Sequence, residues 1–375
     1  MKILIAIPFL SNGGAERAMF NLALYFRKTG AEVSIIASSP DAPNKEKLPP
    51  GFQFYTLDNP LPLNRPSFIS STKKIAAIFR EIKPDVVLST SEYLNVSVLL
   101  GRRLVKGKFK VIISQQINAG IYMKELPFKN RLLIRAIHRF VISRADVIVG
   151  ASEGVAQNFA ALYNLPYPSD KVKFVFNPIY ESSIEQRAKE EIVNENFVLG
   201  SPSLVTVGRL ISQKNQSMLF RAFKLVLKEL PMAKLFIVGI GPDEAILKKL
   251  VAVLHLEDSV IFLGYQENPY AYIDKCDLFV LSSDYEGFGN VVVEALATGT
   301  NVVSTDCPSG PAEILNHGEY GFLSPVADEE KLALKIKEAI ARPLPPEKLL
   351  SRAREFNIEK KGEEYLEIFR KALAK

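Results

Sequence analysis

The sequence predicts an α/β protein made of two Rossmann-like, doubly wound parallel-sheet domains. Its 375 residues are enough for about two domains of roughly 100–200 residues each. Short apolar runs alternate with amphipathic stretches, a pattern typical of βα units in a parallel sheet. The alternation breaks near residues 178–203 and then starts again. We therefore expect two domains that face each other across a cleft, with ligand sites outside the carboxyl ends of both sets of strands.

The first half contains enough elements for a complete domain over residues 1–180. Its expected strands are residues 2–8, 32–37, 85–89, 109–114, 146–149 and 172–176, with helical patterns between most of them. The opening apolar run is short and lacks a small-residue cleavage pattern, so it is interpreted as a buried strand and not as a signal peptide. The charged stretch 181–195 has no strand pattern, which places the domain junction there.

The second half repeats the pattern over residues 200–350. Strands are expected at 203–207, 233–238, 259–263, 277–281 and 301–304, and helices at 215–229, 243–254, 290–298 and 328–340. Prolines between residues 343 and 346 then interrupt the chain. The charged stretch 347–375 is expected to form terminal helices, and the last of them, at about 355–375, can pack back onto the first domain.

Composition excludes several classes of protein. Hydrophobic residues make up 47% and charged residues 23% of the chain, which excludes disordered, collagen-like and mucin-like sequences. Cys276 and Cys307 are the two cysteines, too few for a disulfide-stapled scaffold. No uncharged apolar run reaches the roughly 18 residues of a membrane-spanning helix.

Charge is distributed unevenly along the chain. Residues 1–180 carry 24 Lys and Arg against 12 Asp and Glu, whereas residues 181–375 carry 23 against 29. A basic surface on the first half predicts an anionic partner: nucleic acid, anionic lipid headgroups or a phosphorylated ligand. Composition does not choose among the three.

Glycines follow the first expected strand. Gly13 and Gly14 allow close backbone approach to a ligand, and the N–H groups that open the next helix favour an anion. A tight strand-to-helix turn explains the same glycines equally well. The full G-x-G-x-x-G pattern is absent, which disfavours a nicotinamide dinucleotide.

Two stretches of the second half combine groups that suit a nucleotide sugar. Gly208-Arg209 ends a strand and Lys214 follows five residues later; two cations at a strand tip suit a diphosphate. Glu286 lies in the loop after another strand, before glycines at a helix N-terminus, and Glu294 lies about one turn into that helix. A carboxylate accepts hydrogen bonds from sugar hydroxyls, and helix N–H groups bind phosphate. Ordinary surface charge is the alternative for Arg209 and Lys214.

These motifs together resemble the retaining glycosyltransferases of family 4, which have the two-Rossmann GT-B architecture. The resemblance rests on Gly13-Gly14-Ala15-Glu16, Gly208-Arg209-x4-Lys214, Glu286-x7-Glu294 and the segment Ser304–Ile314, in that order. It implies that Arg209 and Lys214 hold the donor diphosphate, that Glu286 contacts the transferred sugar and that Glu294 binds the ribose. It also implies donor contacts from Gly13, Gly14, Gly208, Gly287, Phe288, Gly289, Asn290 and Val291. Glu16 and Asn177 are expected to contact sugar or acceptor.

The chain departs from the family at one place. Many relatives have a histidine near the donor sugar where this chain has Gln115 and Gln116; either amide can still hydrogen-bond a sugar. His138, His255 and His317 lie elsewhere and are expected to be surface or structural residues.

Three further functions compete with the transferase. Gly150-Ala151-Ser152-Glu153-Gly154 matches the G-x-S-x-G nucleophile elbow of a hydrolase, but Ser152 before a helix is also a natural N-cap. A nucleotide-sugar epimerase and a non-catalytic sugar-binding protein are both compatible with the same architecture.

Cys and His residues are scattered without ligand spacing and no Asp-x-Asp occurs, so no metal site is expected.

Basic residues of the first half are candidates for binding the acceptor or the membrane. Arg131, Arg135 and Arg139 recur at helical spacing beside apolar positions. A helix with such a face can bind an anionic membrane or a polyprenyl diphosphate. The alternative is an ordinary solvent-exposed face. No nucleic-acid module is recognised, so nucleic acid is not expected as a partner.

The sequence as a whole predicts a retaining, metal-independent glycosyltransferase without a cofactor. The expected donor is a nucleotide sugar, which the resemblance makes a UDP-hexose or UDP-N-acetylhexosamine, and the expected acceptor is a glycan or a polyprenyl-diphosphate-linked saccharide. We expect the protein in the cytoplasm, peripheral on the inner face of the membrane.

Overall fold

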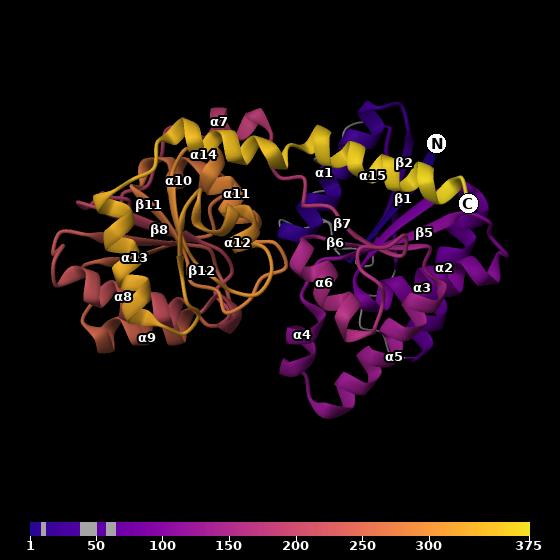
Figure 1. The fold of residues 1–375 in the computed structure, drawn as a ribbon, viewed down its shortest axis with the longest axis horizontal. Coiled ribbons are helices and arrows are strands. Elements are labelled where there is room, and N and C mark those ends of the chain that lie inside the picture. Colours follow the sequence, from indigo (N-terminus) through magenta and orange to yellow (C-terminus); the bar gives the residue numbers. More distant parts are fainter. Residues whose placement is uncertain (9–12, 38–50, 58–64) are drawn as a thin grey trace. The chain divides into compact units, whose positions relative to one another are not determined.

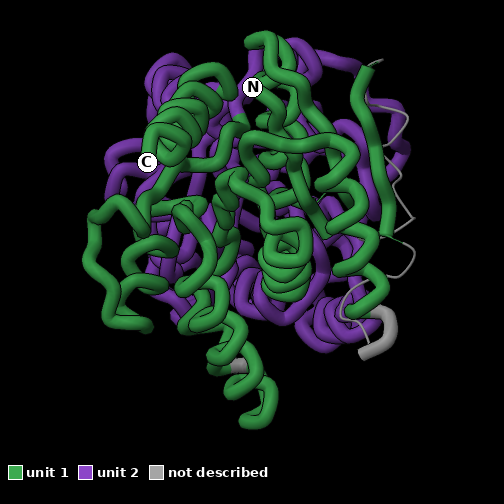
Figure 2. The backbone as a smooth tube through the Cα atoms, turned by 90° about the vertical axis from the view of Figure 1, so that its right-hand side faces the viewer, with its two compact units in different colours: residues 1–179, 358–375 green, residues 180–357 purple. Residues whose placement is uncertain are grey.

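The computed structural model describes residues 1–8, 13–37, 51–57 and 65–375. The described chain forms two compact units (Figure 2). Unit 1 comprises Met1–Ile179 and Ile358–Lys375, and unit 2 comprises Tyr180–Asn357. The chain therefore enters unit 2 once, leaves it once and ends in unit 1.

Within the described residues, unit 1 is built on a parallel sheet of seven strands in the order β3-β2-β1-β4-β5-β6-β7. The strands are β1 (Lys2–Ile7), β2 (Glu32–Ala37), β3 (Gln53–Thr56), β4 (Val86–Thr90), β5 (Lys110–Gln115), β6 (Val147–Gly150) and β7 (Val172–Phe174). The central strands β1, β4, β5 and β6 are buried along almost their whole length, because helices cover both faces of the sheet. Buried β1 confirms the expectation of a first strand at the start of the chain.

Helices flank this sheet on two sides (Figure 1). They are α1 (Gly14–Lys28), α2 (Arg65–Ile82), α3 (Glu92–Leu104), α4 (Ala119–Glu125), α5 (Phe128–Arg144), α6 (Glu153–Leu162) and α15 (Ile358–Leu373). Helices α2, α3 and α5 pack in a row and bury residues such as Phe79, Val98 and Ile134 against the sheet. Helix α15, the last in the chain, packs against α1, which explains why the C-terminal segment belongs to unit 1.

Unit 2 repeats the architecture with a described parallel sheet in the order β10-β9-β8-β11-β12-β13. Its strands are β8 (Ser203–Val207), β9 (Lys234–Val238), β10 (Val260–Gly264), β11 (Leu278–Leu281), β12 (Asn301–Thr305) and β13 (Phe322–Ser324). Its helices are α7 (Ser182–Ala188), α8 (Gln216–Leu227), α9 (Glu244–Leu254), α10 (Pro269–Lys275), α11 (Asn290–Ala297), α12 (Pro311–Ile314), α13 (Glu329–Ala341) and α14 (Pro346–Ala353). Short 3-10 turns η2 (Ser212–Lys214), η3 (Asn316–Gly318) and η4 (Arg354–Phe356) complete it. Two doubly wound parallel sheets confirm the predicted fold class.

The structure also contains elements that periodicity does not reveal. Strands β3 and β13 are short and partly exposed, so neither produces a long apolar run. Helix α7 lies in the stretch where the sequence predicts a domain junction. It buries only Ile184 and Ala188 and packs against α10, so this charged segment is part of unit 2. None of the helices in the described ranges is both long enough and apolar enough to span a bilayer.

Each sheet has one point at which the strand order reverses. In unit 1 this switch point lies between β1 and β4, and in unit 2 it lies between β8 and β11. Loops that leave two such neighbouring strands diverge to opposite faces of the sheet and open a crevice at its carboxyl edge. The two switch points are therefore where ligand sites are expected.

Candidate active site

The site of unit 2 is built from the loops that follow β8 and β11. Gly208 and Arg209 leave β8, and the backbone N–H of Gly208 donates to Val238 at the end of β9. Gly239 has φ +136°, and a Cβ there would lie 1.9 Å from the carbonyl oxygen of Gly208. Glycine is required at this position because the loops after β8 and β9 meet backbone to backbone.

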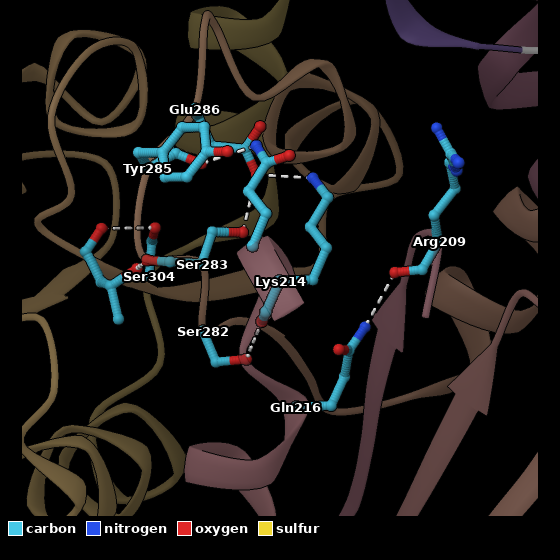
Figure 3. A network of polar contacts seen from close by, with 10 residues as sticks. Arg209, Lys214, Gln216, Ser282, Ser283, Tyr285, Glu286 and Ser304 are labelled. Carbon is cyan, nitrogen blue, oxygen red and sulfur yellow. Dashed lines mark hydrogen bonds and ion pairs between the residues drawn. The ribbon is translucent and has the colours of Figure 1, made fainter. Parts of the chain in front are cut away.

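Lys214 and Glu286 form an ion pair at the centre of this switch point. Lys214 Nζ lies 2.5 Å from Glu286 Oε1, and Ser283 Oγ donates to the same oxygen at 2.7 Å. Figure 3 shows both donors directed at the carboxylate. The Glu286 residue is only 6% exposed, so its charge depends on these two partners.

Further hydrogen bonds hold the two loops together. Asn215, in the left-handed region at φ +44°, caps α8 through Met218 N–H and donates to Asp284 Oδ1 at 2.7 Å. Gln213 Nε2 donates to the carbonyl of Tyr285 at 2.8 Å. Ser282 Oγ donates to the Lys214 carbonyl. The position of the Lys214 ammonium is therefore determined by both loops and not by its own flexible side chain.

Arg209 differs from Lys214 in its surroundings. Its side chain is exposed, and among the described residues its guanidinium has no hydrogen-bond or ion-pair partner. Its carbonyl oxygen accepts from Gln216 Nε2 at 3.0 Å, which fixes the backbone and leaves the guanidinium extended (Figure 3). A planar guanidinium presented in this way is suited to two phosphate oxygens.

Helix α11 begins four residues after Glu286. Gly289 precedes it at φ +91°, and its first turn contains no acidic residue. A Cβ on Gly310 would lie 1.9 Å from the carbonyl oxygen of Phe288, so the loop after β12 packs closely against the backbone of this turn. Gly287, Phe288 and Gly289 are buried, while Asn290 and Val291 are partly exposed. The N-terminus of α11 thus presents its positive end beside Lys214 and Glu286.

Two of the predicted donor contacts have buried side chains. Phe288 packs on Phe356 with ring centroids 5.6 Å apart, so only its backbone is available to a ligand. Glu294 is 8% exposed on α11, between buried Val293 and Ala295. Glu294 is therefore not on a solvent-exposed face of α11.

Cys307 lies near the ion pair. Burial raises the pKa of its thiol to about 12, with a further increase from the negative charge of Glu286. The thiolate is the nucleophilic form of cysteine. Cys307 therefore stays protonated near neutral pH and is not in the nucleophilic form.

The predicted residues of unit 1 lie at the carboxyl edge of its sheet. Gly13 is the N-cap of α1 and Gly14 is its first residue. A Cβ on Gly13 would lie 2.2 Å from Glu16 Oε2, which shows that the Glu16 carboxylate folds back over the turn. A carboxylate in the first turn interacts favourably with the helix dipole.

The two glutamines have different environments. Gln115 is 6% exposed and its amide contacts the carbonyl of Ile117 and the carboxylate of Glu92. Gln116 is partly exposed, donates to Ser114 Oγ at 2.7 Å and accepts from Asn177 Nδ2 at 3.0 Å. Asn177 is 2% exposed. Gln115 and Asn177 are thus engaged inside unit 1, and Gln116 is the partly exposed member of the group.

Ser152 has the geometry of a helix cap. Its Oγ accepts from Val155 N–H at 3.3 Å, its backbone is extended at φ −146°, and the residue is 0% exposed. A nucleophile elbow requires an exposed hydroxyl on a strained turn. The hydrolase alternative therefore fails at this residue.

The histidines are placed as follows. His138 is buried and its Nδ1 lies 2.7 Å from the Tyr163 hydroxyl. His255 ends α9 in the left-handed region, and His317 is exposed within η3. None of the three lies in the loops of the unit 2 site.

The arginine stripe lies on α5. Arg131, Arg135 and Arg139 are exposed, and Arg131 also donates to the carbonyls of Leu126 and Lys124. Three large apolar residues of the same helix are exposed as well: Phe128 by 72%, Leu132 by 53% and Leu133 by 49%. This surface, the α5 face, combines cations with exposed apolar side chains.

Several residues of the unit 2 site are not predicted from the sequence. Ser283, Asn215 and Asp284 carry no recognisable pattern, because each acts through a partner distant in sequence. The glycines of Val238-Gly239-Ile240-Gly241-Pro242 do carry a signal, since paired glycines directly after a strand indicate close backbone approach. A Cβ on Gly241 would lie 2.2 Å from the Leu210 carbonyl, which bears this out.

Comparison with solved structures defines the class of protein. The structure of Anabaena HepE in complex with UDP-glucose matches with a TM-score of 0.81 and 18% identity, covering 99% of this chain and 100% of that one. Sucrose-phosphate synthase from Thermosynechococcus elongatus matches with a TM-score of 0.80 and 18% identity over the full length of both chains. The fold is that of the two-domain GT-B glycosyltransferases.

Comparison of sequences defines the family. Residues 12–182 match the Glycosyltransferase Family 4 model and residues 188–356 the model of glycosyl transferases group 1. An uncharacterized glycosyltransferase of Methanocaldococcus jannaschii is 30% identical over 78% of this chain and 80% of its own. The N-acetylgalactosamine-N,N'-diacetylbacillosaminyl-diphospho-undecaprenol 4-alpha-N-acetylgalactosaminyltransferase of Campylobacter jejuni is 29% identical over 90% and 89%. The chain belongs to the family 4 glycosyltransferases.

Proposed function

We propose that this enzyme transfers a hexose or N-acetylhexosamine from a UDP-sugar to a glycan or a polyprenyl-diphosphate-linked saccharide, with retention of configuration and without a metal. The observation that carries the proposal is the group of Arg209, Lys214 and the α11 N-terminus at the unit 2 switch point. These three positive groups belong to the loops that follow β8 and β11 at one edge of the sheet, where a diphosphate has the matching charge.

The Lys214–Glu286 pair suits both parts of a donor. An ammonium has three N–H donors, so Lys214 can keep Glu286 and still donate to phosphate oxygens. Among the described residues, the two hydrogen bonds to the Glu286 carboxylate both reach Oε1, so Oε2 can accept from a sugar hydroxyl. One pair thus links recognition of the sugar to recognition of the diphosphate.

The proposed chemistry relies on stabilisation of the leaving group. As the bond from the anomeric carbon to the diphosphate breaks, negative charge grows on the phosphate oxygen. Arg209, Lys214 and the α11 N-terminus stabilise that charge, and positioned groups of this kind are worth about 10²–10³ in rate each. The departing oxygen then accepts the proton of the acceptor hydroxyl, which attacks from the same face. Retention follows from that geometry, and the protein's own cations take the role that a divalent ion has in other transferases.

Relatives support the choice of substrates. The HepE structures are complexes with UDP and UDP-glucose, and the Campylobacter enzyme acts on a diphospho-undecaprenol-linked saccharide. The α5 face, with its exposed cations and apolar residues, supports peripheral binding to the anionic inner face of the cytoplasmic membrane.

A donor and acceptor screen tests the proposal. Purified protein is incubated with a panel of nucleotide sugars, with and without a panel of polyprenyl-diphosphate-linked saccharides, and products are identified by mass spectrometry. We expect one added sugar residue from a UDP-sugar, unchanged by EDTA, and an anomeric configuration equal to that of the donor by NMR. Conversion of the nucleotide sugar to an isomer without acceptor would instead identify an epimerase.

A further inference from the structure

Unit 1 has a carboxylate at its own switch point, in the place that Glu286 has in unit 2. Glu92 is the first residue of α3, in the turn after β4, as Glu286 follows β11. Ser91 before it has φ +81°, a conformation that a residue with a side chain adopts only when its surroundings impose it. The turn after β4 is therefore built to present Glu92 at the carboxyl edge of the sheet.

Two side chains approach this carboxylate, and a third holds one of them. Gln115 from β5 hydrogen-bonds to it. His138 from α5 is buried, and its Nε2 lies 3.9 Å from Glu92 Oε1. The Tyr163 hydroxyl lies 2.7 Å from the other ring nitrogen, Nδ1. Burial raises the pKa of Tyr163 to about 12, so the hydroxyl keeps its proton and can donate to Nδ1. In that tautomer the imidazole proton is on Nε2, which faces Glu92.

The carboxylate is ionised and remains accessible. Burial alone would raise the pKa of Glu92, but the nearby His138 ring, the backbone N–H of Glu92 itself and the Gln115 amide outweigh burial and lower it. Its side chain is 19% exposed. Among the described residues, buried Nε2 of His138 has no hydrogen-bond partner, because 3.9 Å is too long for one. A hydroxyl beside both groups can accept from Nε2–H and donate to the carboxylate.

We propose that Glu92 binds a hydroxyl of the acceptor saccharide. The inference rests on the proposed function, in which Arg209, Lys214 and Glu286 of unit 2 hold the donor. A negative carboxylate disfavours a phosphate and favours a neutral polyol, since an ionised carboxylate only accepts hydrogen bonds. The ligand class at the unit 1 switch point is thus the sugar part of the acceptor, and its diphosphate is bound elsewhere.

Two reactions of one enzyme test this assignment. Glu92→Gln keeps the size of the side chain and an acceptor oxygen for its neighbours, but removes the charge. The acceptor is the polyprenyl-diphosphate-linked saccharide to which the wild type transfers a sugar. For this acceptor we expect Glu92→Gln to lower kcat/KM by about 10²-fold, chiefly by raising KM. Hydrolysis of the UDP-sugar by water, measured without acceptor, is expected to stay within twofold of wild type and shows that the variant is folded.

Glu153→Gln is the matched control. Glu153 is the first residue of α6 and follows β6, so it has the same place in a βα unit, two strands away from the switch point. We expect wild-type transfer from it. Undiminished transfer by Glu92→Gln, or an equal loss of transfer and hydrolysis, overturns the role of Glu92. A wild-type enzyme that neither hydrolyses nor transfers from any UDP-sugar overturns the proposed function itself, which is a separate result.

Discussion

Arg209 and Lys214 of the unit 2 site differ in whether a substitution leaves another charged group unpaired. Arg209 is exposed, and its guanidinium forms no hydrogen bond or ion pair with another described residue. Lys214 is 19% exposed and is paired with Glu286, whose side chain is 8% exposed. Removing the Arg209 side chain leaves no charged group unpaired. Removing the Lys214 side chain leaves the buried Glu286 carboxylate without its cation. Activity and stability therefore respond differently at the two positions.

Arg209→Ala is expected to reduce kcat by about 10²–10³, because a positioned cation for the leaving diphosphate is lost. The midpoint of thermal unfolding should stay within about 1 °C of wild type, since no contact of the folded protein is broken. Steady-state kinetics and differential scanning calorimetry measure the two effects. Near-normal turnover would show that Arg209 is ordinary surface charge.

Lys214→Ala is expected to reduce turnover and also to destabilise the protein by about 3 kcal/mol, the low end for breaking a buried ion pair. Adding Glu286→Gln should restore part of that loss, because the unpaired charge is then removed as well. Denaturant unfolding of the two single variants and the double variant gives the coupling. Strictly additive effects would contradict an energetically coupled pair.

Secondary-structure elements depend on local signals and on the neighbours that they meet. Ser152 begins α6 with a hydrogen bond to Val155 N–H, a local signal that is visible in the sequence. Gly362 serves a distant neighbour: a Cβ there would lie 2.1 Å from the Tyr25 ring of α1. The same helix also places Phe369 against Phe26, with ring centroids 5.3 Å apart.

Ser152→Ala is expected to cost about 0.5–2 kcal/mol of stability, the usual range for losing a cap. Transfer activity per folded molecule should be unchanged, because Ser152 is buried and has no part in the chemistry. Chemical denaturation and product assays under the same conditions measure both. Abolished activity with an unchanged unfolding midpoint would instead favour a nucleophile.

Gly362→Ala separates helix propensity from packing. In an isolated helix this change would stabilise by about 1 kcal/mol, but in α15 the new methyl group meets the Tyr25 ring. We expect a net loss of about 1–3 kcal/mol, typical of overpacking. The double variant with Tyr25→Ala, which removes the obstacle, should lose less than Tyr25→Ala and Gly362→Ala added together, as measured by thermal unfolding.

The whole molecule divides its charge between the two halves of the chain. Residues 1–180 hold twice as many cations as anions, whereas anions exceed cations in the remainder. The α5 face lies in the basic half and exposes Phe128, Leu132 and Leu133 beside its arginines. Cations near an anionic surface contribute about 1 kcal/mol each, and exposed apolar side chains add to that by entering the interface.

Replacing Arg131, Arg135 and Arg139 with glutamine is expected to weaken binding to anionic vesicles by about 10-fold or more and to slow transfer to a polyprenyl-linked acceptor. Donor hydrolysis should be spared. Binding of the wild type should fall as salt rises, because screening acts over about 8–10 Å at physiological ionic strength. Vesicle sedimentation at two salt concentrations measures it.

A charge-matched control is available in Arg103, Lys106 and Lys108, three cations of unit 1 outside the α5 face. Their replacement with glutamine removes the same charge and should affect binding less. Equal losses in both triple variants would show that only net charge matters. Absence of wild-type binding even at low salt would contradict a membrane role.

Much of the fold and part of the site follow from local sequence. Alternating apolar runs predicted strands such as β1, β4, β8 and β11, and turn chemistry predicted Gly208, Arg209, Lys214 and Glu286 as loop residues at strand ends. Short edge strands such as β3 were missed because four partly exposed residues produce no periodic signal. The charged helix α7 was missed because it buries only two residues.

Which side chains meet was decided by tertiary structure. The sequence alone determined two βα repeats, a basic first half and the residue types at the strand tips, because such signals lie within a few neighbouring positions. The pairing of Lys214 with Glu286, 72 residues apart, depends on β11 lying beside β8 and not beside β10. The burial of the Gln115 side chain and the position of Glu92 at a switch point likewise depend on strand order. Strand order results from packing over the whole sheet, which no local pattern encodes.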